Sequence, residues 1–73
     1  MQWIKVEPQF GGGITAMGEA GQYAIRKERN GDQVVYFQPD ESNKWQLLGI
    51  FGLREDAVDR AEDHDGEMKH REG

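Results

Sequence analysis

The sequence predicts an α+β fold: a three- to four-stranded antiparallel sheet with meander topology and one C-terminal helix packed on one face. Two segments rich in strand-forming residues flank Asn30-Gly31, a dipeptide typical of tight hairpin turns. A third segment of this kind comes next along the chain, and a segment whose apolar residues follow helical spacing comes after it. Because one amphipathic helix can cover one face of a short meander, these observations together predict the α+β class.

The N-terminal part predicts one short strand and a glycine-rich loop. Residues 2–6 alternate as in a strand, and Pro8 ends the run. Residues 9–21 contain five glycines and are interpreted as a loop-rich connection. The apolar residues within 14–17 leave two alternatives, a short additional strand or a lid that packs on the domain.

The middle of the chain, residues 22–51, is predicted to form a meander of three strands. The strands are expected over 22–29, 33–38 and 44–51. Asn30-Gly31 joins the first two, and because this dipeptide accepts positive φ at both central positions, it predicts a type I′ turn. Pro39 stops the second strand, and the polar residues 40–43 form the next turn.

The helix is predicted over residues 53–65. Its apolar stripe consists of Leu53, Ala57, Val58 and Ala61. Gly66 is expected to end the helix at the C′ position, with residues 67–73 as a flexible tail. The alanines would let the helix lie close to a sheet face that carries Tyr23, Ile25, Trp45 and Leu47.

Chain length and composition restrict the class of protein. The 73 residues are expected to form one domain, 1–73, near the lower size limit for independent folding. The chain has no cysteine, which excludes disulfides and zinc–thiolate sites and fits a reducing cytoplasm. No signal peptide and no apolar run long enough for a membrane helix is visible. We therefore expect a cytoplasmic protein with no membrane contact.

Acidic residues are concentrated in the C-terminal third. Residues 51–73 carry four Lys and Arg against eight Asp and Glu, a net charge of −4 out of −5 for the chain. This region would repel a phosphate backbone, so nucleic-acid contact would have to come from the sheet. Stacking there would use Tyr36, Phe37, Trp45 and Trp3 beside Arg26, Lys27 and Arg29. Aromatic residues in strands are better explained as core, so nucleic acid is not the expected partner.

One group of acids and histidines has the residue types of a metal site: Asp59, Glu62, Asp63, His64, Asp65, Glu67 and His70. Its spacing matches only a fragment of a calcium loop, so we interpret it as a solvated helix face and expect no metal or other cofactor. Glycines 11–13 are followed by neither a Lys nor a helix, as a phosphate-binding loop would require. Ser42, Thr15 and the histidines lie in different segments, so we expect no enzyme activity.

The sheet face opposite the helix is predicted to be more apolar than a solvated face requires. It would carry Ala24, Arg26, Glu28, Val34 or Val35, Tyr36 or Phe37, Leu48 and Ile50, with Trp3 added. An exposed face with an apolar centre and a charged rim indicates a protein interface or a homodimer. The alternative is that the N-terminal strand and the glycine-rich loop cover this face.

Several residues also resemble a group of small uncharacterised proteins that are frequent in phages and mobile elements. The matching positions, within about residues 21–65, are Gly21, Tyr23, Ile25, Gly31, Trp45, Leu47, Leu48, Gly49, Phe51, Glu55, Asp56 and Ala57. The resemblance implies a phage-type origin, the cytoplasm of the host cell, and no active site. The β-β-β-α order is also similar to the DNA-binding domains of tyrosine integrases and plant AP2 proteins, whose sheet face is typically more basic.

These observations predict a non-enzymatic protein-binding module, and the resemblance implies a phage-type inhibitor of a host defence or regulatory protein, like the anti-CRISPR proteins. The helix acids could imitate nucleic-acid phosphates, so the partner would be a host protein with a basic surface. The expected partner-binding residues are Glu55, Asp56, Asp59, Glu62, Asp63, Asp65, Tyr36 and Trp3. Two alternatives stay open: a nucleic-acid-binding domain that uses the sheet, and a self-associating structural protein that forms a homodimer.

Overall fold

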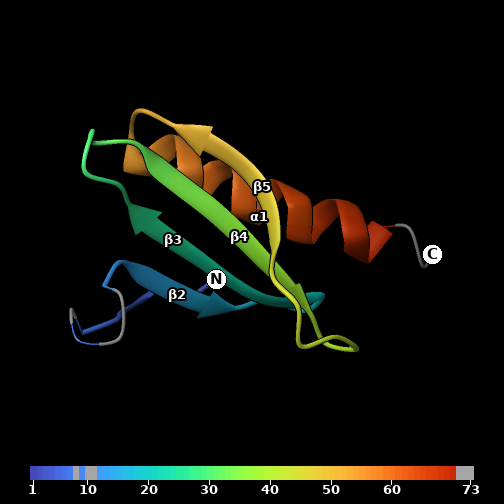
Figure 1. Cartoon of the computed structure of the whole chain (residues 1–73). Helices are drawn as coiled ribbons and strands as arrows, with labels where there is room; N and C mark the ends of the chain where they lie inside the picture. The colour runs from blue at the N-terminus through green and yellow to red at the C-terminus, as the bar shows by residue number, and fades with distance from the viewer. Residues whose placement is uncertain (8, 10–11, 71–73) are drawn as a thin grey trace.

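The protein is an α+β structure in which a five-stranded antiparallel meander is followed by one helix (Figure 1). A computed structural model of the chain describes residues 1–7, 9 and 12–70. The elements are β1 (Ile4–Lys5), β2 (Ile14–Met17), β3 (Gly21–Lys27), β4 (Gln33–Pro39), β5 (Gln46–Phe51) and α1 (Arg54–His70). The predicted fold class is confirmed. Pro8 at the expected strand end, Gly11 of the glycine-rich loop and residues 71–73 of the expected tail lie outside the described residues.

The sheet is larger than predicted because β2 is a strand in a segment interpreted mainly as a loop. It pairs antiparallel with both neighbours, in the registers Ile4↔Thr15 and Thr15↔Ala24. A glycine allows this close pairing: Gly13 has φ of 86°, and a Cβ there would collide with the carbonyl oxygen of Ile25. Of the two alternatives for residues 14–17, the additional strand is confirmed.

The β3–β4 hairpin lies where the sequence predicts it, but its turn is of another type. Gly31 has φ of 94°, whereas Asn30 and every other described non-glycine residue have negative φ, which excludes a type I′ turn. The N–H of Gly31 donates to the carbonyl of Glu28 at 3.0 Å, and the N–H of Glu28 donates to the carbonyl of Asp32 at 2.8 Å. This pattern matches a three-residue loop with glycine in the left-handed position. Asn30 holds the loop through its side chain, which accepts the N–H of Asp32 at 3.0 Å.

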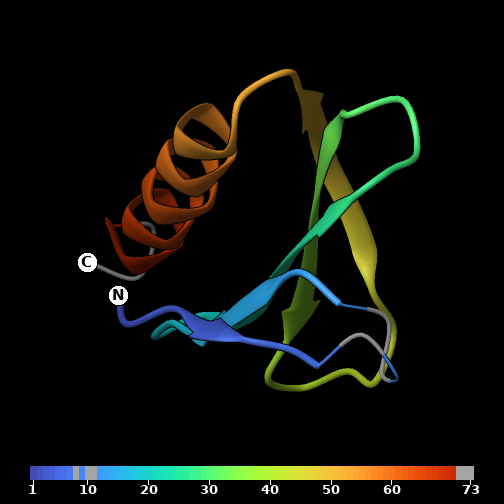
Figure 2. The same ribbon diagram turned by 90° about the vertical axis from the view of Figure 1, so that its left-hand side faces the viewer.

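The core lies between one face of β3 and β4 and the facing side of α1. Its buried members are Tyr23, Ile25, Val35, Phe37, Ala57 and Ala61. Each of the four sheet residues is at most 2% exposed, because the alanines of α1 allow the helix backbone to approach the sheet. Figure 2 shows α1 on one side of the sheet and no helix on the other side, where Val6 and Gly12 of the N-terminal segment line a hollow.

The helix begins and ends later than the sequence predicts. Leu53 precedes α1 and is 57% exposed; its carbonyl accepts the N–H of Ala57 at 3.2 Å, so it contributes backbone to the first turn instead of side chain to the core. Gly66 does not end the helix, since it has no positive φ and α1 continues to His70. Met68 is half-buried, so the buried side of the helix extends past Gly66 and favours its continuation.

Candidate functional site

The side of the sheet that α1 leaves uncovered is the candidate site, and we call it the outer face. Strand pairing places the following side chains on it: Ile4, Thr15, Met17, Gln22, Ala24, Arg26, Val34, Tyr36, Gln38, Leu47 and Ile50. Directly paired residues of antiparallel strands point to the same face, and neighbours along a strand point to opposite faces. The prediction that Tyr23 and Ile25 face the helix, with Ala24 and Arg26 on the other side, agrees with this register.

An irregularity in the β4–β5 pairing decides which β5 side chains lie on the outer face. Val35 pairs with Gly49 while Tyr36 pairs with Leu47, so Leu48 is an extra residue on β5. The strict alternation of β5 is broken there. Leu47 and Ile50 therefore both point to the outer face, and Leu48 packs against the core. The predictions that Leu47 faces the helix and that Leu48 faces away are wrong for this reason.

Trp45 is also on the uncovered side, contrary to the prediction that it faces the helix. It precedes β5, is 45% exposed, and lines the same hollow as Tyr36. Trp3, which was expected to add to this face, instead packs against the core cluster. The reason is strand alternation, because Ile4 points outward and its neighbour Trp3 must then point toward the helix side.

Large apolar side chains are concentrated on the outer face. Five of the seven that are exposed in the described chain belong to it: Ile4, Met17, Trp45, Leu47 and Ile50. Their exposed fractions lie between 45% and 65%. The face of a sheet that is exposed to solvent in a monomer normally carries polar residues, so several exposed large apolar side chains on one face, here near both of its edges, indicate a binding surface.

The outer face contains a hollow of about 400 Å³. Its lining consists of Val6, Gly12, Thr15, Gln22, Ala24, Arg26, Tyr36 and Trp45. The small Ala24 pairs directly with the large Tyr36 across β3 and β4, and Trp45 lines the same hollow. Two polar side chains are fixed there: Thr15 Oγ1 donates to the carbonyl of Tyr23 at 2.7 Å, and Gln22 Nε2 donates to Thr15 Oγ1 at 3.0 Å.

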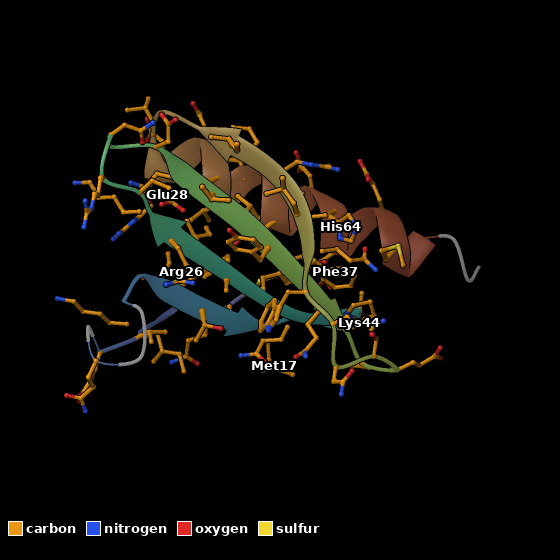
Figure 3. The ribbon with its side chains drawn as sticks, in the orientation of Figure 1. Met17, Arg26, Glu28, Phe37, Lys44 and His64 are labelled. Atoms are coloured by element: carbon orange, nitrogen blue, oxygen red, sulfur yellow. The ribbon has the colours of Figure 1, made fainter. Side chains whose placement is uncertain are left out.

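Arg26 is the one side chain of this lining that carries a full charge at neutral pH. It projects from β3 and is labelled in Figure 3, in which the outer face is toward the viewer. Arg26 is exposed, and with the described residues its guanidinium forms neither an ion pair nor a hydrogen bond.

The six helix acids predicted to bind a partner do not form one uniform surface. Five of them are exposed, and the side chains of four of these five form no hydrogen bond or ion pair with the described residues: Glu55, Asp56, Asp59 and Asp63. Glu62 accepts the indole N–H of Trp3 at 3.3 Å and lies 3.9 Å from the N-terminal amine. Asp65 accepts the backbone N–H of Glu19 at 3.2 Å and of Ala20 at 2.9 Å. Glu62 and Asp65 therefore attach α1 to the N-terminal strand and to the β2–β3 turn.

A partly buried polar cluster joins α1 to β3, and no local pattern in the sequence predicts it. The Tyr23 hydroxyl lies 2.8 Å from His64 Nδ1 and 3.5 Å from Asp65 Oδ1. The His64 ring packs 4.6 Å from the ring of Phe37. Burial and the nearby Asp65 carboxylate raise the pKa of Tyr23 well above its usual range. The cluster holds the helix on the sheet and is not open to a substrate on the outer face.

Metal-site geometry is absent from the described residues, where no three His, Asp or Glu side chains come together. The side chain of His70, one of the candidate ligands, lies outside the described side chains. No helix in the described part of the chain is long and apolar enough to cross a membrane. Comparison with protein-family models, with curated proteins and with solved structures finds no match to this chain.

Proposed function

We propose that this chain is a non-enzymatic protein-binding module whose contact surface is the outer face. The observation that carries the proposal is the group of five exposed apolar side chains on that face, beside a hollow lined by Tyr36 and Trp45. α1 already closes the core from the other side, so folding of the domain does not require these side chains to be buried. A partner that removed them from water would gain roughly 25 cal/mol for each Å² of apolar surface. Tyr and Trp are also the residue types that contribute most at interface centres.

The sequence resemblance to small phage proteins supports a more specific version of the proposal. In this version, the module inhibits a host defence or regulatory protein by occupying a surface that the host protein needs. Inhibition by occupation requires a stable binding face, and the exposed apolar side chains of the outer face would provide it.

A second candidate surface is the outward side of α1. Glu55, Asp56, Asp59 and Asp63 are exposed there, and none of them has a hydrogen bond or ion pair with the described residues. A row of such carboxylates would occupy a basic nucleic-acid channel by charge alone, in a manner that weakens steeply with salt. This candidate concerns four acids rather than six, because Glu62 and Asp65 are engaged within the domain.

One capture experiment separates the two surfaces. Wild-type protein, a face variant (Leu47→Ser with Ile50→Ser) and a helix variant (Asp59→Lys with Asp63→Lys) are immobilised and exposed to lysate of the host cell. Mass spectrometry then identifies the proteins retained. A protein that is retained by wild type and the helix variant, and lost on the face variant, supports the proposal. The reverse pattern assigns binding to the helix acids, and retention by all three variants contradicts both surfaces.

A further inference from the structure

Arg26 determines which kind of segment can occupy the outer face. Its guanidinium is hydrated in the free protein because the side chain is exposed. Any partner that covers the hollow takes this charge out of water, and burying an unpaired charge is strongly unfavourable. No Asp or Glu occupies a paired strand position of the outer face, and Glu28, which directly follows β3, forms no ion pair with Arg26. The anion must therefore come from the partner.

A second copy of the chain does not provide this anion. In a two-fold interface the outer face would meet itself, so the same set of strand side chains would be present on both sides. The paired strand positions of that set contain Arg26 and no acid, so face-to-face pairing of these strands would bring two guanidinium groups into the interface with no carboxylate from the same positions. The charge pattern thus favours a different protein over self-association.

A nucleic acid is also a poor match for this face. Phosphate backbones are bound by several cations in a row, and the hollow offers Arg26 alone. Lys27 pairs with Gln33 and so lies on the other side of the sheet, and Arg29 lies in the hairpin turn. Across the sheet, α1 carries seven Asp and Glu against three Lys and Arg. This surplus of four negative charges opposes the approach of a polyanion.

We propose that the outer face binds a short peptide segment of a partner protein in which one Asp or Glu lies between apolar residues. The carboxylate pairs with the Arg26 guanidinium, whose planar fork suits a bidentate contact. The flanking apolar side chains pack on Tyr36, Trp45 and the exposed Leu47. This inference rests on the proposed function, because it specifies the chemistry of the partner at the same face.

Selection from a random heptapeptide library displayed on phage tests the inference without knowledge of the natural partner. We expect enriched peptides to carry an Asp or Glu with apolar neighbours. A representative synthetic peptide should bind the Arg26→Gln variant at least about tenfold more weakly than wild type, as for loss of a charge-assisted contact. The same peptide with its acid changed to the amide should lose a similar factor with wild-type protein. Arg29→Gln is the matched control, since it removes a cation outside the hollow, and it should bind like wild type.

A further test exchanges the charges of Arg26 and the peptide acid. It predicts a gain of binding, which a misfolded variant could not show. The Arg26→Glu variant should reject the acidic peptide and bind its counterpart in which the acid is replaced by Lys. Enriched peptides that lack acids, bind Arg26→Gln normally and lose binding on Tyr36→Ala would overturn the inference and leave the proposed face intact. Failure to enrich any peptide that depends on Tyr36 would overturn both. Binding of a labelled single-stranded oligonucleotide that requires Arg26, or concentration-dependent dimers in light scattering, would overturn the peptide assignment.

Discussion

The contact between Asp65 and the β2–β3 turn can be measured by removing one carboxylate. In Asp65→Ala, the backbone N–H groups of Glu19 and Ala20 lose their acceptor, which lies at 3.2 and 2.9 Å in the native protein. Hydrogen bonds to charged groups contribute about 1.5–3 kcal/mol each when buried. This site is partly exposed and water can replace part of the loss, so we expect a decrease of about 2 kcal/mol in the free energy of unfolding. For a domain of this size the midpoint of thermal unfolding would fall by roughly 10 °C.

The control for this experiment is Asp63→Ala, in the same part of α1. It removes the same charge and makes the same change in helix propensity, but Asp63 is exposed and has no hydrogen bond with the described residues. The difference between the two variants in chemical denaturation therefore isolates the contacts of Asp65. If both variants unfold at the same denaturant concentration, Asp65 does not attach the helix to the turn and the reasoning is wrong.

Three further predictions concern the polar cluster, the length of the helix and the glycine that precedes β2. Because folding raises the pKa of Tyr23 above its ordinary value of 10.0, the stability contributed by the neutral hydroxyl is complete below about pH 10 and is lost as the pH rises beyond that value. In a Tyr36→Phe background, which leaves Tyr23 as the single tyrosine, absorbance at 295 nm should show tyrosinate only together with unfolding in alkali; ionisation of the folded protein near pH 10 would contradict a buried hydroxyl. Gly66→Ala should stabilise the protein by about 0.5–1 kcal/mol, since Gly66 lies inside α1 with nothing within 4 Å of a new Cβ. Gly13→Ala should destabilise it by more than 1 kcal/mol, because φ is 86° and the Cβ would meet the carbonyl of Ile25. Destabilisation by Gly66→Ala would instead support a helix that ends at that glycine.

The parts of the fold that were predicted correctly depend on local patterns. Tyr23 and Ile25 alternate with Ala24 and Arg26, and this period of two sets the faces of β3 without any knowledge of its partners. The alanines of α1 were likewise visible as one stripe with helical spacing. Such features follow from the chain within a few residues, so they do not require tertiary contacts.

The features that were missed depend on contacts between distant segments. The extra residue at Leu48 is defined only by the pairing of β5 with β4, and it moves Leu47 to the opposite face. Asp65 looked like any other helix acid until the β2–β3 turn came within hydrogen-bond distance of it. Gly66 has the residue type of a helix end, yet α1 continues through it to His70, and Met68 in the following turn is half-buried. In each case tertiary context overrides a local signal.

Mutations at the outer face can separate the stability of the domain from its binding function, because the apolar side chains there are exposed. In a Leu47→Thr, Ile50→Thr double variant, little burial is lost, since these side chains are 59% and 57% exposed. Thr is β-branched, a shape that strands favour, so we expect the free energy of unfolding to stay within about 0.5 kcal/mol of wild type. The matched change at a fully buried position of the same sheet, Val35→Thr, should cost about 2 kcal/mol, because it buries a hydroxyl in the core. Peptide binding should follow the opposite order, lost in the double variant and retained in the folded fraction of Val35→Thr. A double variant as unstable as Val35→Thr would mean that Leu47 and Ile50 serve the fold, and the outer face would no longer be a surface kept apolar for a partner.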